Sequence, residues 1–394
     1  MKLILVHFFL WSFVFVIKSY SEDNKTLQFN LNPSPKINFG KDLSFKAIGF
    51  LQTDAVFHLK DNADHPNGTH IRRARVGFLG KVKNKLTYKF LYDFGHNNPE
   101  LQDAYISYHL DPKHSISFGQ FKEAIGLEWQ SASPNWMFME LPVTTALTPR
   151  RSIGLSLSSL YKRWSFDLSL HGENTNKQRS DDEGFSLNFH GIYTYHEKND
   201  RLFHLGMSCS YRKPEASTNS FTYKIKTDSS TNTTASLSSG VINNTDYAKL
   251  ICFEKLFLFK NYKIQGEYSN IKIERDNSLG EESFQAYYIQ ASKILTKEKY
   301  SFSRNKHQFN TIKTKSVFDG GRGAWELAVR YGLLDLNSQA ITQGQLKKHM
   351  FAVNWYGNIS LKVSLNYTYA TTENSSNIAN ENEHIIGFRT NFKI

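Results

Sequence analysis

The chain has 394 residues, a formal net charge of +12, and an aromatic-rich composition with 30 Phe and 20 Tyr. Its mean hydropathy of −0.48 excludes a membrane protein built from apolar helices, but it suits a barrel in which half of each strand faces water. The positive surplus favours nucleic acid, acidic surfaces or small anions as partners. The export signal described next argues against nucleic acid.

Residues 1–21 have the features of a secretory signal peptide. A short positive start precedes an apolar run over residues 3–17, and Ser19 and Ser21 place small residues before a cleavage site at Glu22. An uncleaved membrane anchor is the alternative, although the run is short for a spanning helix. No later stretch reaches the roughly 18 apolar residues that such a helix needs.

Residues 22–43 contain two prolines and are predicted to form a short extended periplasmic segment, with pairing to a neighbour as a further option. Residues 44–394 are predicted to form an outer-membrane barrel, because their polarity alternates at period two. In residues 86–94 one parity is aromatic and aliphatic, and the other is mostly polar. The first parity holds Leu86, Tyr88, Phe90, Tyr92 and Phe94, and the second holds Thr87, Lys89, Leu91 and Asp93.

About sixteen segments follow this pattern, and the even number fits a single-chain bacterial barrel with both termini in the periplasm. The predicted strands cover 44–58, 70–80, 85–94, 101–110, 114–121, 151–158, 163–171, 185–195, 201–211, 246–256, 261–270, 284–294, 323–333, 346–356, 359–369 and 383–394. The fold class is therefore all-β, a transmembrane antiparallel β-barrel.

The connections have the length asymmetry of such barrels, with long external loops and short periplasmic turns. Long connections follow odd-numbered strands, and they include 122–150, 172–184, 212–245 and 370–382. Short ones follow even-numbered strands, and they include 81–84, 111–113, 159–162 and 357–358. Residues 295–322 break the rule, because they are long, basic and periplasmic. Segment 212–245 is rich in Ser, Thr and Asn, which predicts a flexible surface loop without a core.

The connection 122–150 is too long and too apolar for a solvated hairpin. It carries Trp129, Trp136 and the run Met137–Met139. We expect it to fold into the lumen, where it would bury these side chains against the wall and narrow the channel. Packing at a subunit contact or over the barrel mouth is the alternative.

Basic residues predict where an anion would pass. Arg73 and Arg75 share the parity expected of the lumen, whereas Arg72 has the opposite parity and is expected at the rim. Arginine suits phosphate-like anions, because its planar fork offers paired donors and stays charged. Pairing of these arginines with lipid headgroups or wall carboxylates is the alternative. The complete set of predicted anion-pathway residues is Arg72, Arg73, Arg75, Lys89, Lys122, Arg150 and Arg151.

The long periplasmic connection holds a second group of cations, which we call the periplasmic basic cluster. Its members are Lys293, Lys297, Lys299, Arg304, Lys306, Lys313 and Lys315, with Glu298 as the one acid among them. A simple solvated loop is one interpretation. An electropositive exit for anions, or a dock for an acidic periplasmic partner, is the other.

An ordered series of motifs over residues 45–394 resembles the phosphate-selective porins O and P. The series comprises Ile71–Phe78 (IRRARVGF), Tyr88–Phe94 (YKFLYDF), Leu101–Tyr108 (LQDAYISY), Phe118–Glu128 (FGQFKEAIGLE), Tyr288–Ser292 (YIQAS), Gly323–Tyr331 (GAWELAVRY), Asn354–Tyr356 (NWY) and Leu365–Tyr367 (LNY). The resemblance implies a sixteen-stranded, homotrimeric outer-membrane porin that passes small anions. It also implies entrance arginines, an inward-folded constriction loop and a periplasmic lysine cluster.

Two departures concern the central anion site of that family. Where those porins place a lysine before the tryptophan, this chain has Pro134 and Asn135 before Trp136, and no basic residue follows Glu140 in the stretch 139–142. The resemblance therefore carries over a general anion preference but not tight phosphate selectivity.

The sequence thus predicts a non-enzymatic outer-membrane pore for small anions such as phosphate, with outer-membrane lipid and further copies of the chain as partners. No cofactor or metal is expected. A barrel lipase or protease is a rival, but G-x-S-x-G, H-E-x-x-H and metal-spaced Cys/His patterns are missing. A surface adhesin that uses 212–245, or a structural barrel without anion selectivity, is another alternative. Cys209 and Cys252 are interpreted as isolated wall residues, with a disulfide as the second option.

Overall fold

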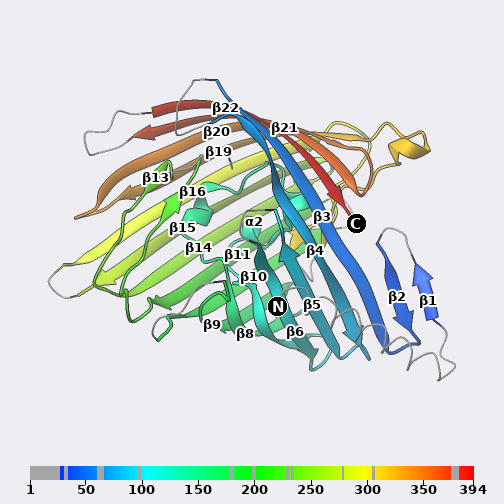
Figure 1. Cartoon of the computed structure of the whole chain (residues 1–394), viewed down its shortest axis with the longest axis horizontal. Helices are drawn as coiled ribbons and strands as arrows, with labels where there is room; N and C mark the ends of the chain where they lie inside the picture. Colours follow the sequence, from blue (N-terminus) through cyan, green and yellow to red (C-terminus); the bar gives the residue numbers. More distant parts are fainter. Residues whose placement is uncertain are drawn as a thin grey trace.

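The computed structural model describes residues 27–30, 34–59, 66–95, 99–176, 182–197, 201–227, 231, 235–276, 279–303, 307–373 and 381–394. The predicted signal peptide 1–21 lies outside these residues. Within the described ranges, sixteen antiparallel strands follow one another around a closed barrel (Figure 1). The barrel closes where β22 pairs with β3, from Ile385 opposite His58 to Lys393 opposite Phe50.

Each of the sixteen predicted strands is present, and most are longer than the alternation alone indicated. The barrel strands are β3 (Leu43–His58), β4 (Gly68–Val82), β5 (Leu86–Asp93), β6 (Glu100–His109), β7 (His114–Lys122), β8 (Arg151–Leu160), β9 (Trp164–His171), β10 (Phe185–Glu197), β11 (Arg201–Lys213), β14 (Thr245–Phe259), β15 (Tyr262–Arg275), β16 (Glu281–Ile294), β19 (Ala324–Asn337), β20 (Thr342–Tyr356), β21 (Leu361–Glu373) and β22 (Glu381–Lys393).

The described part of the predicted N-terminal segment is a hairpin. Strands β1 (Leu27–Asn30) and β2 (Lys36–Phe39) pair with each other, and β2 pairs with the first residues of β3. Because β22 stops opposite Phe50, β2 covers an edge of β3 that would otherwise stay unpaired. Figure 1 shows this hairpin at the right, beside the barrel wall.

Side chains alternate around the wall as predicted. In β21, Leu365 and Tyr367 are exposed on the outer surface, whereas Ser364, Asn366 and Thr368 are buried on the lumen side. The two cysteines are free: they occupy opposite parities on neighbouring strands, with Cys209 facing outward and Cys252 buried in the lumen. No helix among the described residues is both long and apolar enough to span a membrane.

The barrel wall differs in height around its circumference. We call the short strands β5–β9 the low side and the remaining, longer barrel strands the high side. Strands β5 and β9 have eight residues each, whereas β14 and β20 have fifteen. On the high side the lumen face is apolar rather than polar near the loop end of the strands. A buried cluster there contains Ala248, Leu250, Ile271, Ile273, Phe284, Leu334, Leu336 and Leu346.

The prediction of a flexible surface loop at 212–245 is wrong for its described residues. Phe221 and Ile242 form a β-bridge, and Tyr223, Leu237 and Ile242 pack on the apolar wall of the high side. The few large apolar residues of this segment are enough to bury it, because the wall supplies most of the apolar cluster. Composition alone could not reveal this, since the matching surface lies on distant strands.

The periplasmic connection also enters the barrel. Tyr300, Phe309 and Ile312 are buried against Leu256 and other wall residues in a second apolar cluster. The interpretation of residues 295–322 as a simple solvated loop is therefore wrong. Lys297, Lys299, Lys313 and Lys315 remain exposed, while Lys293 stays in β16 and Arg304 and Lys306 lie outside the described residues. Apolar clusters thus fill the high side of the lumen from both ends.

The burial of Tyr223, Leu237 and Ile242, which are described residues of segment 212–245, makes a testable prediction. Ile242 is 1% exposed and its neighbour Val241 is 63% exposed, so Ile242→Asp would bury a charge in the cluster while Val241→Asp would not. We expect Ile242→Asp to release the segment, which would raise single-channel conductance and open it to protease. Val241→Asp should behave as wild type. Equal protection in both variants would contradict the packing.

Candidate functional site: the channel constriction

The loop that connects β7 to β8 folds into the lumen, as predicted. It contains the short helix α2 (Leu127–Gln130) and the 3-10 turns η1 (Ser133–Asn135) and η2 (Val143–Ala146), and α2 lies inside the ring of strands (Figure 1). The loop turns inward at Gly126, whose φ of 69° favours glycine. A Cβ there would lie 2.6 Å from Glu267 Oε2 on the wall.

Side chains of the high wall satisfy the irregular backbone at the tip of this loop. Lys362 Nζ donates to the carbonyl of Trp136, and Asn354 Nδ2 donates to that of Met137 at 2.9 Å. Arg389 and Arg330 donate to the carbonyls of Met139 and Glu140. Because buried carbonyl groups need partners, this row of donors explains how a non-regular segment is held in the lumen.

Glu140 ties the loop tip to the strands where the barrel closes, β4 and β22 on either side of β3. Arg72 Nε and Nη2 bind its two carboxylate oxygens at 2.9 and 3.0 Å, and Arg389 Nη2 adds a contact of 3.1 Å. Arg389 also binds both oxygens of Asp54 at 2.6 Å. Burial alone would raise the pKa of Glu140, but the Arg72 guanidinium outweighs it and holds this pKa well below its usual range.

The expectation that Arg72 lies at the rim is wrong. The register between β3 and β4 shifts between Gln52 and Thr53, so that Arg72 has no cross-strand partner. Such a bulge reverses the parity of one residue and re-aims its side chain. Arg72 and Arg73 therefore both reach the lumen, where strict alternation predicted only Arg73.

The periplasmic connection holds the same loop from the other end of the barrel. Gln308 Oε1 accepts from the amide of Ala132 at 3.0 Å, and Asn135 Nδ2 donates to the carbonyl of Phe309 at 2.8 Å. Thr311 Oγ1 donates to Asn135 Oδ1 at 2.8 Å. The two segments therefore meet inside the barrel, and no pattern in the sequence predicts this contact.

A cavity of about 1550 Å³ passes between the loop and the low side of the wall. It reaches from Lys224 and Lys226, on the external side, to Lys46 and Lys393, at the periplasmic end. Its described lining includes thirteen Lys and Arg residues and five Asp and Glu residues. All seven predicted anion-pathway residues line it, and they are Arg72, Arg73, Arg75, Lys89, Lys122, Arg150 and Arg151.

Most lining cations near the constriction are paired. Arg75 Nε contacts Asp93 at 2.7 Å, while Lys89 and Arg151 share Asp103 at 2.6 and 2.8 Å. These carboxylates were not singled out by the sequence reasoning, although Asp93 shares the polar parity of Lys89. These contacts fix the wall side chains: the Arg75–Asp93 pair is neutral, whereas the group of Lys89, Arg151 and Asp103 keeps one positive charge.

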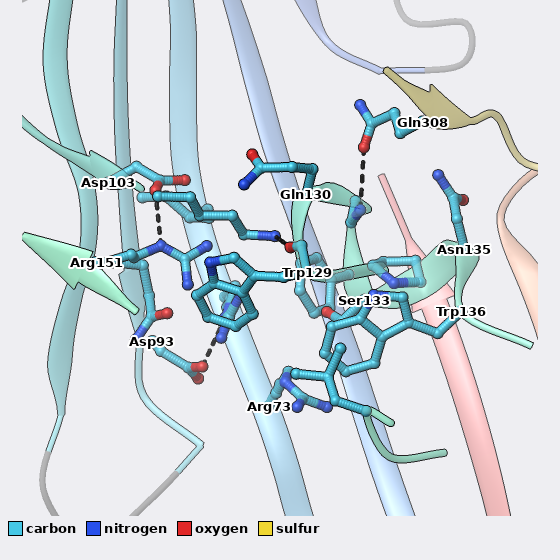
Figure 2. Close-up of a pocket in the computed structure, with 18 of the residues that line it drawn as sticks. Arg73, Asp93, Asp103, Trp129, Gln130, Ser133, Asn135, Trp136, Arg151 and Gln308 are labelled. Carbon is cyan, nitrogen blue, oxygen red and sulfur yellow. Dashed lines mark hydrogen bonds and ion pairs between the residues drawn. The ribbon is translucent and has the colours of Figure 1, made fainter. Parts of the chain in front are cut away.

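Arg73 and Lys122 differ, because among the described residues neither contacts a carboxylate at ion-pair distance. Arg73 Nη1 donates to Gln52 at 2.9 Å, and its Cζ lies 4.9 Å from the centre of the Trp136 ring. Lys122 Nζ donates to the carbonyls of Trp129 and Ser131 at 2.6 and 2.9 Å and lies 4.8 Å from the Trp129 ring centre. Figure 2 shows Arg73 next to Trp136 and Arg151 next to Trp129.

Comparisons with known proteins agree with this architecture. The family model "Phosphate-selective porin O and P" matches residues 45–394. Porin O of Pseudomonas aeruginosa is 23% identical over 382 residues, which cover 86% of this chain and 85% of that protein.

Solved structures show the same fold at low identity. A loop-deletion mutant of OmpT, an outer membrane protein of Vibrio cholerae, matches with a TM-score of 0.59 and 10% identity over 90% of this chain and 100% of that one. An anion-selective porin from Comamonas acidovorans matches with a TM-score of 0.55 and 11% identity over 90% and 100%.

A closed sixteen-stranded barrel with a loop folded across its lumen defines an outer-membrane porin. Within that class, the chain belongs to the phosphate-selective porin O and P family, whose model covers nearly its whole barrel.

The Glu140 contacts predict how the loop responds to substitution. Glu140→Gln weakens the attachment to Arg72 and Arg389, so we expect larger current fluctuations in single-channel recordings at pH 7. A lowered pKa means that the contribution of the carboxylate is complete above the ordinary value near 4.3 and is lost only as pH falls through the lowered one. The current fluctuations of wild-type channels should therefore remain small at pH 4.

Glu100→Gln is the matched control, because Glu100 lines the same cavity but has no part in holding the loop tip. It removes the same charge and should leave the fluctuations unchanged. Equally small current fluctuations in Glu140→Gln and wild-type channels would show that the carbonyl contacts alone hold the loop.

Proposed function

We propose that this porin is a water-filled channel for passive diffusion of small anions, phosphate among them, and that lumen Arg and Lys residues select the ion. The observation that carries the proposal is the excess of thirteen basic over five acidic residues along one cavity that runs through the barrel. In a narrow pore these charges lie within the screening length of about 8–10 Å from a passing ion. They lower the barrier for an anion and raise it for a cation.

Arg73 and Lys122 are the proposed central steps of the pathway. Their partners are neutral oxygens and indole rings, so their positive charge is not cancelled locally. Trp136 and Trp129 restrict the cations without neutralising them, since an indole ring carries no net charge. An anion can therefore exchange some of its water for N–H donors and still leave, which conduction requires.

A general anion preference is favoured over tight phosphate binding. Asn135, which stands where the resemblance leads one to expect a lysine, uses its amide to bind Phe309 and Thr311 of the periplasmic connection. Lys362 approaches the loop but donates to the Trp136 carbonyl. The similarity to an anion-selective porin from Comamonas acidovorans and to Porin O supports the broader preference.

Assembly and export complete the proposal. We place this chain in a homotrimer, because OmpT of Vibrio cholerae, a fold neighbour with a TM-score of 0.55, is described in a trimer form. Residues 1–21 are the proposed signal peptide. The exposed lysines 297, 299, 313 and 315 would give the periplasmic exit a positive potential, and Lys313 also lines the cavity.

Substitution of Arg73 should change ion selectivity, whereas removal of the ion pair that Arg75 forms with Asp93 should not. A unit charge about 6 Å from an ion is worth about 0.7 kcal/mol in water-like surroundings. Its loss raises the barrier for chloride and lowers that for potassium, so we expect Arg73→Gln to lower the chloride-to-potassium permeability ratio about tenfold. The reversal potential of planar bilayers across a KCl gradient measures this ratio.

The control is the double variant Arg75→Gln with Asp93→Asn, which removes the ion pair and leaves the net charge unchanged. Its reversal potential should match that of the wild type. Cation selectivity in the wild-type channel would overturn the proposed anion function.

A further inference from the structure

The outer surface of the high wall carries a groove that has no part in ion passage. It has a volume of about 880 Å³ and crosses β9, β10, β11, β14, β15 and β16. This volume lies in the range of about 300–1,000 Å³ that is common for small-molecule sites. Most of its lining is aromatic or aliphatic, so its occupant must be largely apolar.

The strand register builds this groove from three adjacent rows of side chains. One row, Met207–Phe253–Tyr268, forms a ridge, and a second row, Phe203–Phe257–Ile264, forms the opposite ridge. The floor between them is the row Trp164–Tyr193–Leu205–Lys255–Gly266–Ile289. Gly266, in the middle of the floor, has no side chain and deepens the groove where the ridges flank it.

Lys255 supplies the charge in the groove. It is exposed on the outer face and lies between Phe253 and Phe257 on the same strand. Its Nζ lies 5.9 Å from the ring centre of Phe203, which is paired with Phe257, one step nearer the periplasmic end. Lys255 therefore extends toward the periplasmic interface, as a lysine on a lipid-facing surface does.

The depth of Lys255 fits that interface. It lies four residues before Phe259, the last residue of β14. With a rise of about 3.3 Å per residue and the usual barrel tilt of about 40°, this places its Cα about 10 Å from the end of the wall. Below it, Lys260 lies in the turn after β14, with its Nζ 5.2 Å from the Phe259 ring, and Lys293 Nζ lies 4.8 Å from the Tyr262 ring.

We propose that this groove binds a glycerophospholipid of the periplasmic leaflet, with one acyl chain along the floor and the phosphate at Lys255. A lipid-facing lysine is unfavourable without an anion, and among the described residues the Lys255 ammonium group has no ion-pair partner and lies near the Phe203 ring. Lys260 and Lys293 add positive charge at the rim, so a headgroup with net negative charge binds best. The site does not depend on the proposed anion selectivity, because it faces away from the lumen.

Other occupants fit the groove less well. Lipopolysaccharide occupies the external leaflet, whereas Lys255 extends toward the periplasmic one. A second copy of the chain would have to cover Lys255 with an apolar wall or an outer-face carboxylate. Among the described residues, the exposed ion pairs of Lys272 with Glu281 and of Lys347 with Glu373 lie toward the external ends of their strands, away from Lys255.

The test is native mass spectrometry of the full barrel in mild detergent, titrated with phosphatidylglycerol and, separately, with phosphatidylethanolamine. We expect phosphatidylglycerol to bind more tightly. Lys255→Gln should weaken its binding about fivefold, the effect of one basic residue near an anionic surface, while Lys255→Arg should retain it. Leu205→Trp, which fills the floor without a change of charge, should weaken the binding of both lipids.

Lys249→Gln is the matched control. Lys249 also faces outward on β14, but it lies toward the external end, with its Nζ 4.8 Å from the Tyr247 ring. Its substitution should leave phospholipid binding unchanged. Heat-dependent gel mobility and channel conductance confirm that each variant is folded, and both should be unaffected.

Three results would overturn the proposal. Equal phosphatidylglycerol binding by Lys255→Gln and wild type would show that the lysine does not bind the phosphate. Binding of lipopolysaccharide with no binding of either phospholipid would assign the groove to the external leaflet. A change of oligomeric state in Leu205→Trp without loss of lipid would assign it to a contact between copies.

Discussion

The shape of the channel depends on the attachment of one irregular loop to the inside of the barrel. The Glu140 carboxylate accepts hydrogen bonds from Arg72 and Arg389, and wall side chains satisfy the carbonyls of Met137 and Glu140. Without these donors the loop would leave several polar backbone groups buried and unpaired, at about 1–3 kcal/mol each. The polar lumen face of the strands is therefore a scaffold for the loop as well as a surface for water.

Two apolar clusters fill the high side of the lumen and leave only the low side open. The segment 214–244 enters from the external end and the periplasmic connection enters from the other end, and each brings aromatic or aliphatic side chains to an apolar stretch of wall. Water and ions are left with the low side, where the wall is polar. The position of the channel thus follows from where inward-facing side chains are apolar, which is a property of individual strands.

The sequence predicted the barrel well, because a strand with one face in lipid must alternate, and each strand carries that signal by itself. It also predicted the inward loop, since Trp136 and Met137–Met139 cannot remain in water. It failed where the evidence lies in distant parts of the chain. The partner of segment 214–244 is a surface shared by several strands, and the bulge at Arg72 depends on how β3 and β4 pair.

Charge pairing explains how a lumen with so many cations can be both stable and permeable. Asp93 neutralises Arg75, and Asp103 is shared by Lys89 and Arg151, so these three cations keep one net positive charge and give the wall rigid polar structure without strong repulsion. If every cation were unpaired, an anion would bind too tightly to leave. If every cation were paired, the constriction would have no preference for either sign. The indole rings beside Arg73 and Lys122 hold two cations in place without cancelling them, and this intermediate state fits the anion pathway that we propose.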